Sequence, residues 1–188
     1  MSRWSRRAWL RAALGAGVLL RTPLDAAAQA VDARSQRPQS GDRCVFAEGA
    51  QQGQVVGPAD VLAGKPPIKA YPFDPVSRVV RDGSRLNQIL LLRLSPDEID
   101  AATRAQSADG VVAYSGVCTH TGCDVTMWQA EVQRFRCPCH ESEFDPRDAG
   151  RVVGGPAPRR LPRLPLKIVD GAIVVGGGFT GRPGFQPG

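Results

Sequence analysis

This chain of 188 residues has few histidines, few aromatic residues and few clustered basic residues. Each scarcity limits the kinds of function that the protein can have. There are two histidines, and phenylalanine, tyrosine and tryptophan together make up 6% of the residues. After residue 30 the longest run of lysine or arginine is the pair Arg159-Arg160. Surfaces that bind nucleic acid need basic clusters and aromatic rings on which bases stack, so no nucleic-acid partner is expected.

Long apolar runs are also missing from the sequence. A membrane-spanning helix needs about 20 mostly apolar residues, whereas the best candidate, residues 12–20, is bracketed by Arg11 and Arg21. The preceding Ser5-Arg6-Arg7-Ala8-Trp9-Leu10 resembles a twin-arginine export motif, and Ala28-Gln29-Ala30 is a small-residue cleavage site. Residues 1–30 are therefore predicted to be a twin-arginine signal peptide that directs the protein to the periplasm and is cleaved after Ala30. The alternative is that this segment is retained as a membrane anchor.

Most of the basic charge belongs to this leader. The chain carries a formal charge of +6, and residues 1–30 contribute +4 of it through five arginines and one aspartate. The remaining +2 is spread over residues 31–188, a length that suits one domain with one sizeable core. We expect this domain to be soluble, or held at a membrane by a partner or by the uncleaved leader.

Cysteine and histidine, in contrast, are concentrated in two short boxes. Cys118-Thr-His120-Thr-Gly-Cys123 and Cys137-Pro-Cys139-His140-Glu-Ser142 hold four of the five cysteines and both histidines within 23 residues. Two thiolates and two imidazoles are the ligand set in which two histidines replace two cysteines on one iron of a [2Fe-2S] cluster. The boxes supply that set as two cysteine–histidine pairs, Cys118 with His120 and Cys137 with His140.

Zinc binding, haem attachment and a purely structural role fit the boxes less well. Zinc sites usually use Cys-x2-4-Cys or His-x3-5-His pairs, which Cys118-Thr-His120 does not match. Attachment of haem c needs two residues between its cysteines, and Cys137-Pro-Cys139-His140 has one. Buried structural cysteines would not account for the lack of histidine outside the boxes.

The boxes resemble those of the Rieske iron–sulfur proteins, in the disulfide-containing form of respiratory complexes and of the arsenite oxidase small subunit. The resemblance implies a [2Fe-2S] cofactor held by the four residues named above. It also implies a disulfide between Cys123 and Cys139 that ties the two loops together. Such a bond persists only in an oxidising compartment, which agrees with the predicted export.

Further positions match the family near the cluster. Ser142 lies where a serine hydroxyl points at a bridging sulfide, and Phe144 stands where high-potential respiratory members carry a hydrogen-bonding tyrosine. Phenylalanine cannot donate a hydrogen bond, so a lower potential is expected. Gly155-Pro156 matches the proline loop that covers the cluster. Cys44, far from the boxes, is expected to be a buried residue or free thiol.

Acidic residues beside the second box leave two possibilities open. Glu141 replaces a glycine that is common in respiratory boxes, and Glu143 is close to it in sequence. Carboxylates near the cluster would disfavour the addition of an electron and lower the potential. Alternatively, both side chains point into water and are screened.

Local patterns predict an all-β fold with one short helix. Residues 44–77 are rich in glycine and proline and are read as loop. The helix is expected from Pro96 to Ala105, because Ser95-Pro96-Asp97-Glu98 combines a cap, a first-turn proline and an acidic third position. Strands are expected at residues 88–94, 111–114, 125–128, 132–136, 151–153, 164–169 and 172–175, with hairpin turns at 129–131 and Asp170-Gly171.

The resemblance adds the architecture that these patterns do not give. It implies an antiparallel β-sandwich base built from residues before and after an inserted cluster-binding subdomain, at about residues 114–155 within the domain 31–188. The tail from Gly176 is glycine-rich and is expected to fray, or to act as a docking strap.

The function that follows is single-electron transfer rather than chemistry on a substrate in a pocket of the protein's own. Both histidines are used by the cluster, so no second iron site of the oxygenase kind can form. We expect a periplasmic subunit of a larger oxidoreductase. The alternatives are the Rieske subunit of a quinol-oxidising cytochrome bc type complex, and a stand-alone carrier that docks on a c-type cytochrome. The redox partner is accordingly a larger oxidoreductase subunit, a quinol site or a c-type cytochrome.

Overall fold

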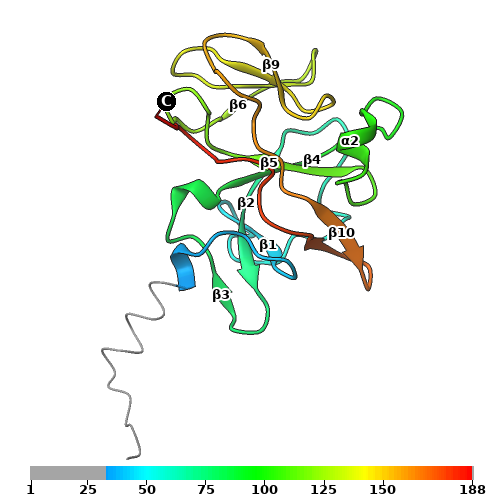
Figure 1. Ribbon diagram of the computed structural model, residues 1–188. Helices are drawn as coiled ribbons and strands as arrows, with labels where there is room; N and C mark the ends of the chain where they lie inside the picture. Colours follow the sequence, from blue (N-terminus) through cyan, green and yellow to red (C-terminus); the bar gives the residue numbers. More distant parts are fainter. Residues whose placement is uncertain (1–32, 188) are drawn as a thin grey trace, which may run out of the picture.

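The computed structural model describes residues 33–187, and the predicted signal peptide lies outside them. Strands dominate this segment, and all pairings between its named strands are antiparallel (Figure 1). The all-β prediction is therefore confirmed. None of the helices described is both long and apolar enough to span a bilayer. They are residues 33–35, the 3-10 turn η1 (Arg85–Asn87) and α2 (Ala101–Arg104).

The base of the molecule is a five-stranded sheet with the order β1-β2-β4-β5 and β3 paired to β2. Residues 44–77 were expected to be loop, and this was wrong, because most of β1 and all of β2 lie there. β1 and β2 are separated by a long connection, so their pairing is a tertiary contact that local sequence does not encode. The strands are β1 (Arg43–Phe46), β2 (Ile68–Asp74), β3 (Val79–Val80), β4 (Ile89–Arg93) and β5 (Val111–Ser115).

A hairpin of β10 (Leu166–Val169) and β11 (Ala172–Val175) completes the base. Its turn is formed by Asp170 and Gly171, both with positive φ, 50° and 73°, as a two-residue type I′ turn requires. The predicted hairpin is confirmed. The segments that flank it bind β5 on one side, through Leu164 N to Ala113 O at 2.9 Å. On the other side the end of β11 binds the segment before β1, through Val175 N to Asp42 O at 2.8 Å.

A third sheet, with the order β6-β7-β8-β9, is formed entirely by chain between β5 and β10 (Figure 1). Its four strands fall within the interval 114–155 expected for an inserted unit. The predicted hairpin at 125–136 is present with its turn displaced to residues 130–133, and β8 was not predicted. The strands are β6 (Met127–Gln129), β7 (Arg134–Arg136), β8 (Glu143–Asp145) and β9 (Arg151–Gly154).

Two hydrophobic cores share strands β4 and β5. Along β4, Ile89 and Leu91 point into the core between the base sheet and the β10–β11 hairpin. Leu90 and Leu92 point into a second core on the other face, together with Phe135 of the third sheet. A strand buried on both faces needs a continuous apolar run, and residues 89–92 supply it. The third sheet therefore packs against the base through a shared hydrophobic core and is not joined to it by the connecting chain alone.

The helix begins later than its sequence pattern predicted. Residues 96–98 form only a turn, and α2 starts after Asp100, whose carboxylate accepts a hydrogen bond from Thr103 N at 2.6 Å. Ile99 is buried in the second core, and Asp100 N donates to Arg147 O at 2.9 Å. These tertiary contacts take the backbone out of the helical path that Ser95 and Pro96 favour.

One buried ion pair joins the segment before β1 to the base sheet. Arg81 donates from Nε and Nη2 to the two carboxylate oxygens of Asp42, at 2.8 and 3.1 Å. Both side chains are almost fully buried, with 5% and 3% of their surface exposed. Removal of one member of such a pair leaves a charge in a site without water, which costs far more than the loss of an exposed pair.

Arg81→Ala is therefore expected to lower the free energy of unfolding by about 3 kcal/mol, because the Asp42 carboxylate stays buried without its partner. Chemical denaturation followed by circular dichroism measures this. Arg34→Ala, which breaks the exposed pair with Asp82, is the matched control and should leave stability nearly unchanged. Equal losses in the two variants would contradict this role for the buried pair.

Candidate metal centre

The two boxes form neighbouring loops at the end of the third sheet, and each loop is closed by its own backbone. In the first box, Cys118 N donates to Cys123 O at 2.8 Å and Gly122 N donates back to Cys118 O at 3.1 Å. In the second box, Cys137 N donates to Ser142 O at 2.9 Å and Glu141 N to Cys137 O at 3.0 Å. Both loops are thus fixed before any ligand binds.

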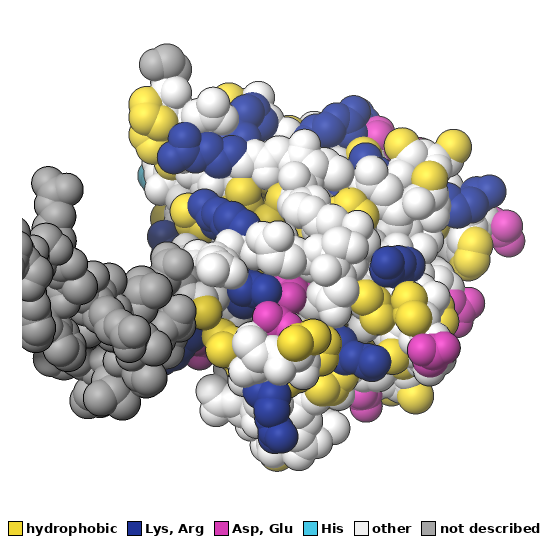
Figure 2. Space-filling view, turned by 60° about the horizontal axis from the view of Figure 1, so that its bottom comes forward, with side chains coloured by type: hydrophobic (Ala, Val, Ile, Leu, Met, Phe, Trp, Pro, Cys, Tyr) yellow, Lys and Arg dark blue, Asp and Glu magenta, His cyan; other side chains and the backbone are white. Residues whose placement is uncertain are grey.

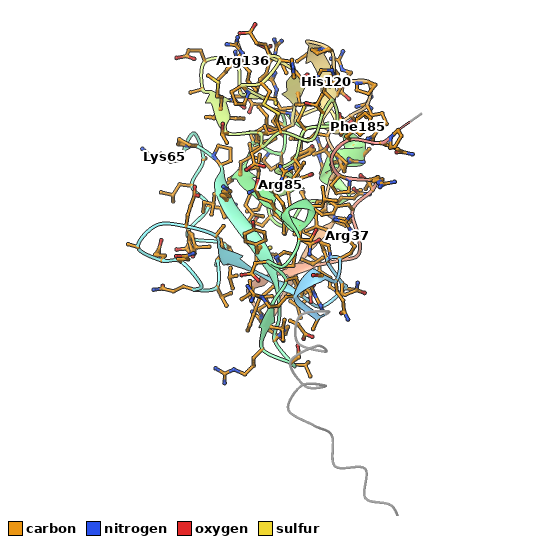
Figure 3. The ribbon with its side chains drawn as sticks, turned by 90° about the vertical axis from the view of Figure 1, so that its left-hand side faces the viewer. Arg37, Lys65, Arg85, His120, Arg136 and Phe185 are labelled. Carbon is orange, nitrogen blue, oxygen red and sulfur yellow. A yellow bond between two sulfur atoms is a disulfide. The ribbon has the colours of Figure 1, made fainter. Side chains whose placement is uncertain are left out.

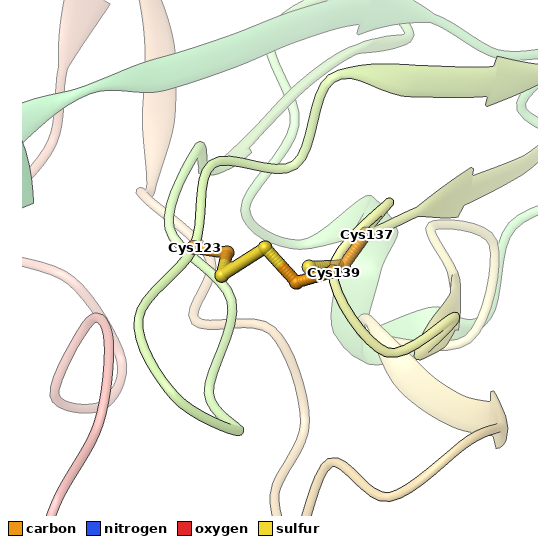
Figure 4. Close-up of side chains that lie close together, drawn as sticks. All are labelled: Cys123, Cys137 and Cys139. Carbon is orange, nitrogen blue, oxygen red and sulfur yellow. A yellow bond between two sulfur atoms is a disulfide. The ribbon is translucent and has the colours of Figure 1, made fainter.

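A disulfide joins the loops (Figure 4). Cys123 and Cys139 are bonded, with their Cα atoms 6.5 Å apart, so the expected pairing is confirmed. The sulfur of Cys137 lies within 4.8 Å of both disulfide sulfurs. This compact trio is not a metal site, because two of its three sulfurs are consumed by the disulfide and cannot act as thiolates.

The other four cysteine and histidine side chains of the boxes gather beside the disulfide. Cys118 and Cys137 are free and almost completely buried, with 1% and 2% of their surface exposed. Burial, reinforced by the neighbouring Cys137, raises the pKa of the Cys118 thiol to about 11. The rings of His120 and His140 meet edge to face, with their centroids 4.7 Å apart.

This donor set fits an iron–sulfur cluster of mixed ligands. Nδ1 of His120 is buried and has no hydrogen-bond partner, which is costly unless the atom coordinates a metal. Two thiols held in a dry site give up their protons readily only to a metal. The residues that could hold the cluster are Cys118, Cys137, His120 and His140.

The proline loop lies against the second box. Ser142 Oγ accepts a hydrogen bond from Ala157 N at 3.1 Å, and the same hydroxyl lowers the pKa of the Cys118 thiol as a hydrogen-bonding neighbour. Gly155 has φ of +75°, and a Cβ there would lie 2.5 Å from Ser142 Cα. Backbone therefore packs on backbone at this point, and Pro156 beside it is exposed. The loop closes one side of the site.

The sequence profile described as "Rieske [2Fe-2S] domain" matches residues 87–165, which include both boxes and the proline loop. These residues are a Rieske [2Fe-2S] domain. The cofactor of this domain is therefore a [2Fe-2S] cluster.

Similar proteins carry the same domain. The chain is 41% identical over 83 residues to the "Cytochrome bc1 complex Rieske iron-sulfur subunit" of Streptomyces lividans, covering 44% of this chain and 49% of that protein. It is 40% identical over 106 residues to a "Putative respiratory nitrate reductase subunit Rieske" of Haloferax mediterranei, covering 55% and 47%. The chain thus spans about half the length of these two relatives. The soluble domain of Rieske protein II from Sulfolobus acidocaldarius is 23% identical and covers 54% of this chain and 66% of its own, with a TM-score of 0.42.

Phe144 belongs to the buried core that also contains the two free cysteines of the Rieske site. It lies in β8 with none of its surface exposed, and its backbone pairs with Phe135 of β7. Its side chain belongs to the same apolar cluster as Cys118 and Cys137. The position is therefore close to the two thiols, and it presents a ring without a hydrogen-bond donor.

The two carboxylates beside the second box are neutralised by arginines of β7. Glu141 forms an ion pair with Arg136. Glu143 pairs with Arg134 at 3.4 Å and accepts a hydrogen bond from Gln129 Nε2 at 3.1 Å. Glu141 is 71% exposed and so points into water, as the second possibility expected, whereas Glu143 is 22% exposed and lies mostly within the protein. The influence of an ion pair on the cluster is weaker than that of a free charge.

Two supporting residues had no recognisable sequence pattern. Thr119 Oγ1 donates to Arg159 O at 2.7 Å, which joins the first box to the proline loop beside His120. The guanidinium of Arg159 donates in turn to Gly184 O at 2.8 Å. The tail therefore packs on the Rieske site as far as Gly184 and does not fray there, while its role as a docking strap stays a prediction. Only the tertiary contacts identify these roles.

Cys44 is separate from the site, as expected. It lies in the core of the base with no exposed surface. Burial raises the pKa of its thiol to about 12, so it stays protonated. It is a small apolar residue of the core and not a ligand.

The close approach of Gly155 to the second box generates a prediction. Gly155→Ala is expected to displace the proline loop and to lower both the melting temperature and the lifetime of the cluster, because its Cβ would overlap Ser142. Differential scanning calorimetry and the decay of the cluster's visible absorption measure these. Gly171→Ala is the matched control, with φ of +73° and open space around the added Cβ. Cluster lifetimes that fall equally in both variants would mean that backbone conformation, not the overlap, matters.

Proposed function

We propose that this chain is a periplasmic Rieske subunit that passes single electrons within a larger oxidoreductase. The observation that carries the proposal is the pairing of two buried free thiols with two adjoining imidazoles on loops joined by a disulfide. The domain is built around that group of side chains and, in the described residues, offers no comparable set of reactive groups for a substrate.

Within this proposal, Cys118, Cys137, His120 and His140 would hold the cluster. When bound, the cluster supplies a one-electron redox centre at potentials of about −150 to +300 mV, above the roughly −400 mV of plant-type clusters. The protein holds the thiolates in a dry site, and the disulfide keeps the two loops together. Ser142 supplies the hydroxyl beside the sulfur atoms.

The histidine side of the site is where electrons and protons would pass. His140 is exposed and His120 is half-buried, whereas both cysteines are enclosed. The two imidazole rings can therefore be approached from solvent or by a partner. The partner would dock against this end of the molecule.

The choice among partners follows from Phe144 and from the relatives. Phe144 cannot hydrogen-bond the cluster, so a lower redox potential is expected. A lower potential favours a subunit of a larger oxidoreductase over the quinol site of a high-potential respiratory complex. The likeness to a respiratory nitrate reductase subunit is consistent with this. The second candidate, the Rieske subunit of a quinol-oxidising bc type complex, is favoured by the 41% identity to a bc1 subunit. The third candidate is a stand-alone carrier that passes electrons to a c-type cytochrome.

The periplasmic location is part of the proposal. Its support is the twin-arginine motif and the Cys123–Cys139 disulfide, which needs an oxidising compartment. Export by the twin-arginine route would deliver the protein folded with its cluster in place.

The proposal is tested on protein purified from a periplasmic fraction by N-terminal sequencing and EPR-monitored redox titration. We expect a start at Val31 and a Rieske signal that is lost in Cys118→Ser, His120→Ala, Cys137→Ser and His140→Ala. Cys44→Ala, which removes a buried thiol elsewhere, is the matched control and should keep the signal. A signal unchanged in any of the four variants removes that residue from the ligand set. An uncleaved chain in the membrane, with a potential near the top of the range, would favour the bc type complex.

Phe144→Tyr is expected to raise the midpoint potential by tens of millivolts. A hydroxyl near the ligand sulfurs stabilises the reduced cluster, and about 1.4 kcal/mol of excess stabilisation corresponds to about 59 mV. The same redox titration measures the shift. Phe46→Tyr adds a hydroxyl to a ring of β1 that packs against the other core, and it should leave the potential unchanged. No upward shift in Phe144→Tyr would contradict the role given to this position.

A further inference from the structure

The tail crosses the edge of the first box and is held there by one arginine. Arg159 donates from Nη1 to Arg182 O at 3.1 Å and from Nη2 to Gly184 O at 2.8 Å. Gly184 is buried against Leu86 and Val117, and Phe185 lies beside Gly122 of the first box. The segment is therefore part of the surface next to His120.

This segment brings an apolar ring to the edge of the site. The Phe185 side chain is 57% exposed although it is anchored through its neighbours. Figure 3 shows His120, Phe185, Arg85 and Arg37 in this order from the cluster end toward the base. An exposed aromatic ring on a fixed backbone is a common anchor at protein interfaces.

Arginines surround that ring, and most of them lack an acidic partner. Arg37, Arg159 and Arg182 form no ion pair with the described residues, and only Arg85 does, with Asp124 at 2.6 Å. Burial, and then the charge of Arg182, lower the pKa of Arg37. By comparison, Figure 2, in which the bottom of the molecule comes forward, shows Lys and Arg side chains interspersed with acidic ones. We call Arg37, Arg159, Arg182 and Phe185 the basic rim.

Positive charge that the protein leaves uncompensated attracts opposite charge from outside. Elsewhere near the site the arginines are neutralised within the chain, as Arg134 and Arg136 are by Glu143 and Glu141. The basic rim is different, because its guanidinium groups face solvent or bind only carbonyl and amide oxygens. A complementary field speeds encounter and orients the partner with the histidine end toward it.

We propose that the basic rim is the docking surface for a redox partner whose own face beside its redox centre is rich in carboxylates. The proposal rests on the electron-transfer function above and adds the chemistry of the partner. Phe185 supplies the apolar contact, and the arginines supply the orientation. The tail is then a docking element as well as a support of the first box.

The experiment measures second-order electron transfer by stopped-flow between the holoprotein and two soluble c-type cytochromes of similar potential. One cytochrome has an acidic haem-edge face and the other a lysine-rich one. With the acidic cytochrome the rate should fall at least about tenfold between about 0.01 M and about 1 M salt, as the Debye length shrinks. With the lysine-rich cytochrome the rate should rise with salt. A rate independent of salt, a preference for the lysine-rich cytochrome, or no transfer to either from holoprotein with an intact EPR signal overturns the proposal.

Charge-reversal variants show which part of the surface attracts the acidic cytochrome. Arg182→Glu should lower the low-salt rate with the acidic cytochrome about fivefold, because two unit charges change at roughly 8 Å from the partner's carboxylates in water. Lys167→Glu makes the same change in net charge on β10, away from the rim, and should change the rate less than about twofold. Arg37→Glu gives a second variant of the rim. Equal effects of rim and control variants would mean that only net charge matters.

Two further outcomes are distinguishable. Co-sedimentation with phosphatidylserine vesicles that is lost in Arg182→Glu, with electron-transfer rates unchanged, would assign the rim to a lipid surface and overturn the proposal. Absence of the Rieske EPR signal in the unaltered protein would instead refute the proposed function itself.

Discussion

The rest of the structure depends on the pairing of β4 with β5, because these strands are buried on both faces. Ile89 and Leu91 face one core and Leu90 and Leu92 the other, so neither core can form without the same two strands. The first box follows β5 directly. Tyr114, at the end of β5, donates from its hydroxyl to Pro146 O at 2.6 Å and packs edge to face on Phe135. The loop that holds the cluster is thus an extension of the most buried part of the protein.

This arrangement explains which parts of the fold could be predicted. The run at residues 89–92 is apolar at every position, and Asp170-Gly171 specifies a turn by backbone conformation alone, so both were visible in the sequence. β1 and β2 were missed because their stability comes from partners distant in the chain. The start of α2 was misplaced because burial of Ile99 and the contact with Arg147 outweigh a good capping sequence.

The same distinction applies to the candidate metal centre, where some residues could be predicted from the sequence and others could not. The ligand-type residues were predictable because metal chemistry restricts residue type and spacing. The disulfide was expected from the resemblance to the Rieske proteins, and the structure confirms it. The roles of Thr119 and Arg159 were not predictable, because a threonine and an arginine are common residues and only their mutual contact gives them a function. The arginines that neutralise Glu141 and Glu143 come from the adjacent strand, and that pairing follows from register.

The contact between Arg159 and the tail also has a consequence for the order in which the protein matures. The first box is synthesised about sixty residues before Gly184, which Arg159 binds. While that later segment is still in the ribosome, the loop around His120 has its internal hydrogen bonds but lacks this outer support. The outer support of the first box is thus the last part of the site to be made, and a chain interrupted before Gly184 keeps the ligand residues but loses this support.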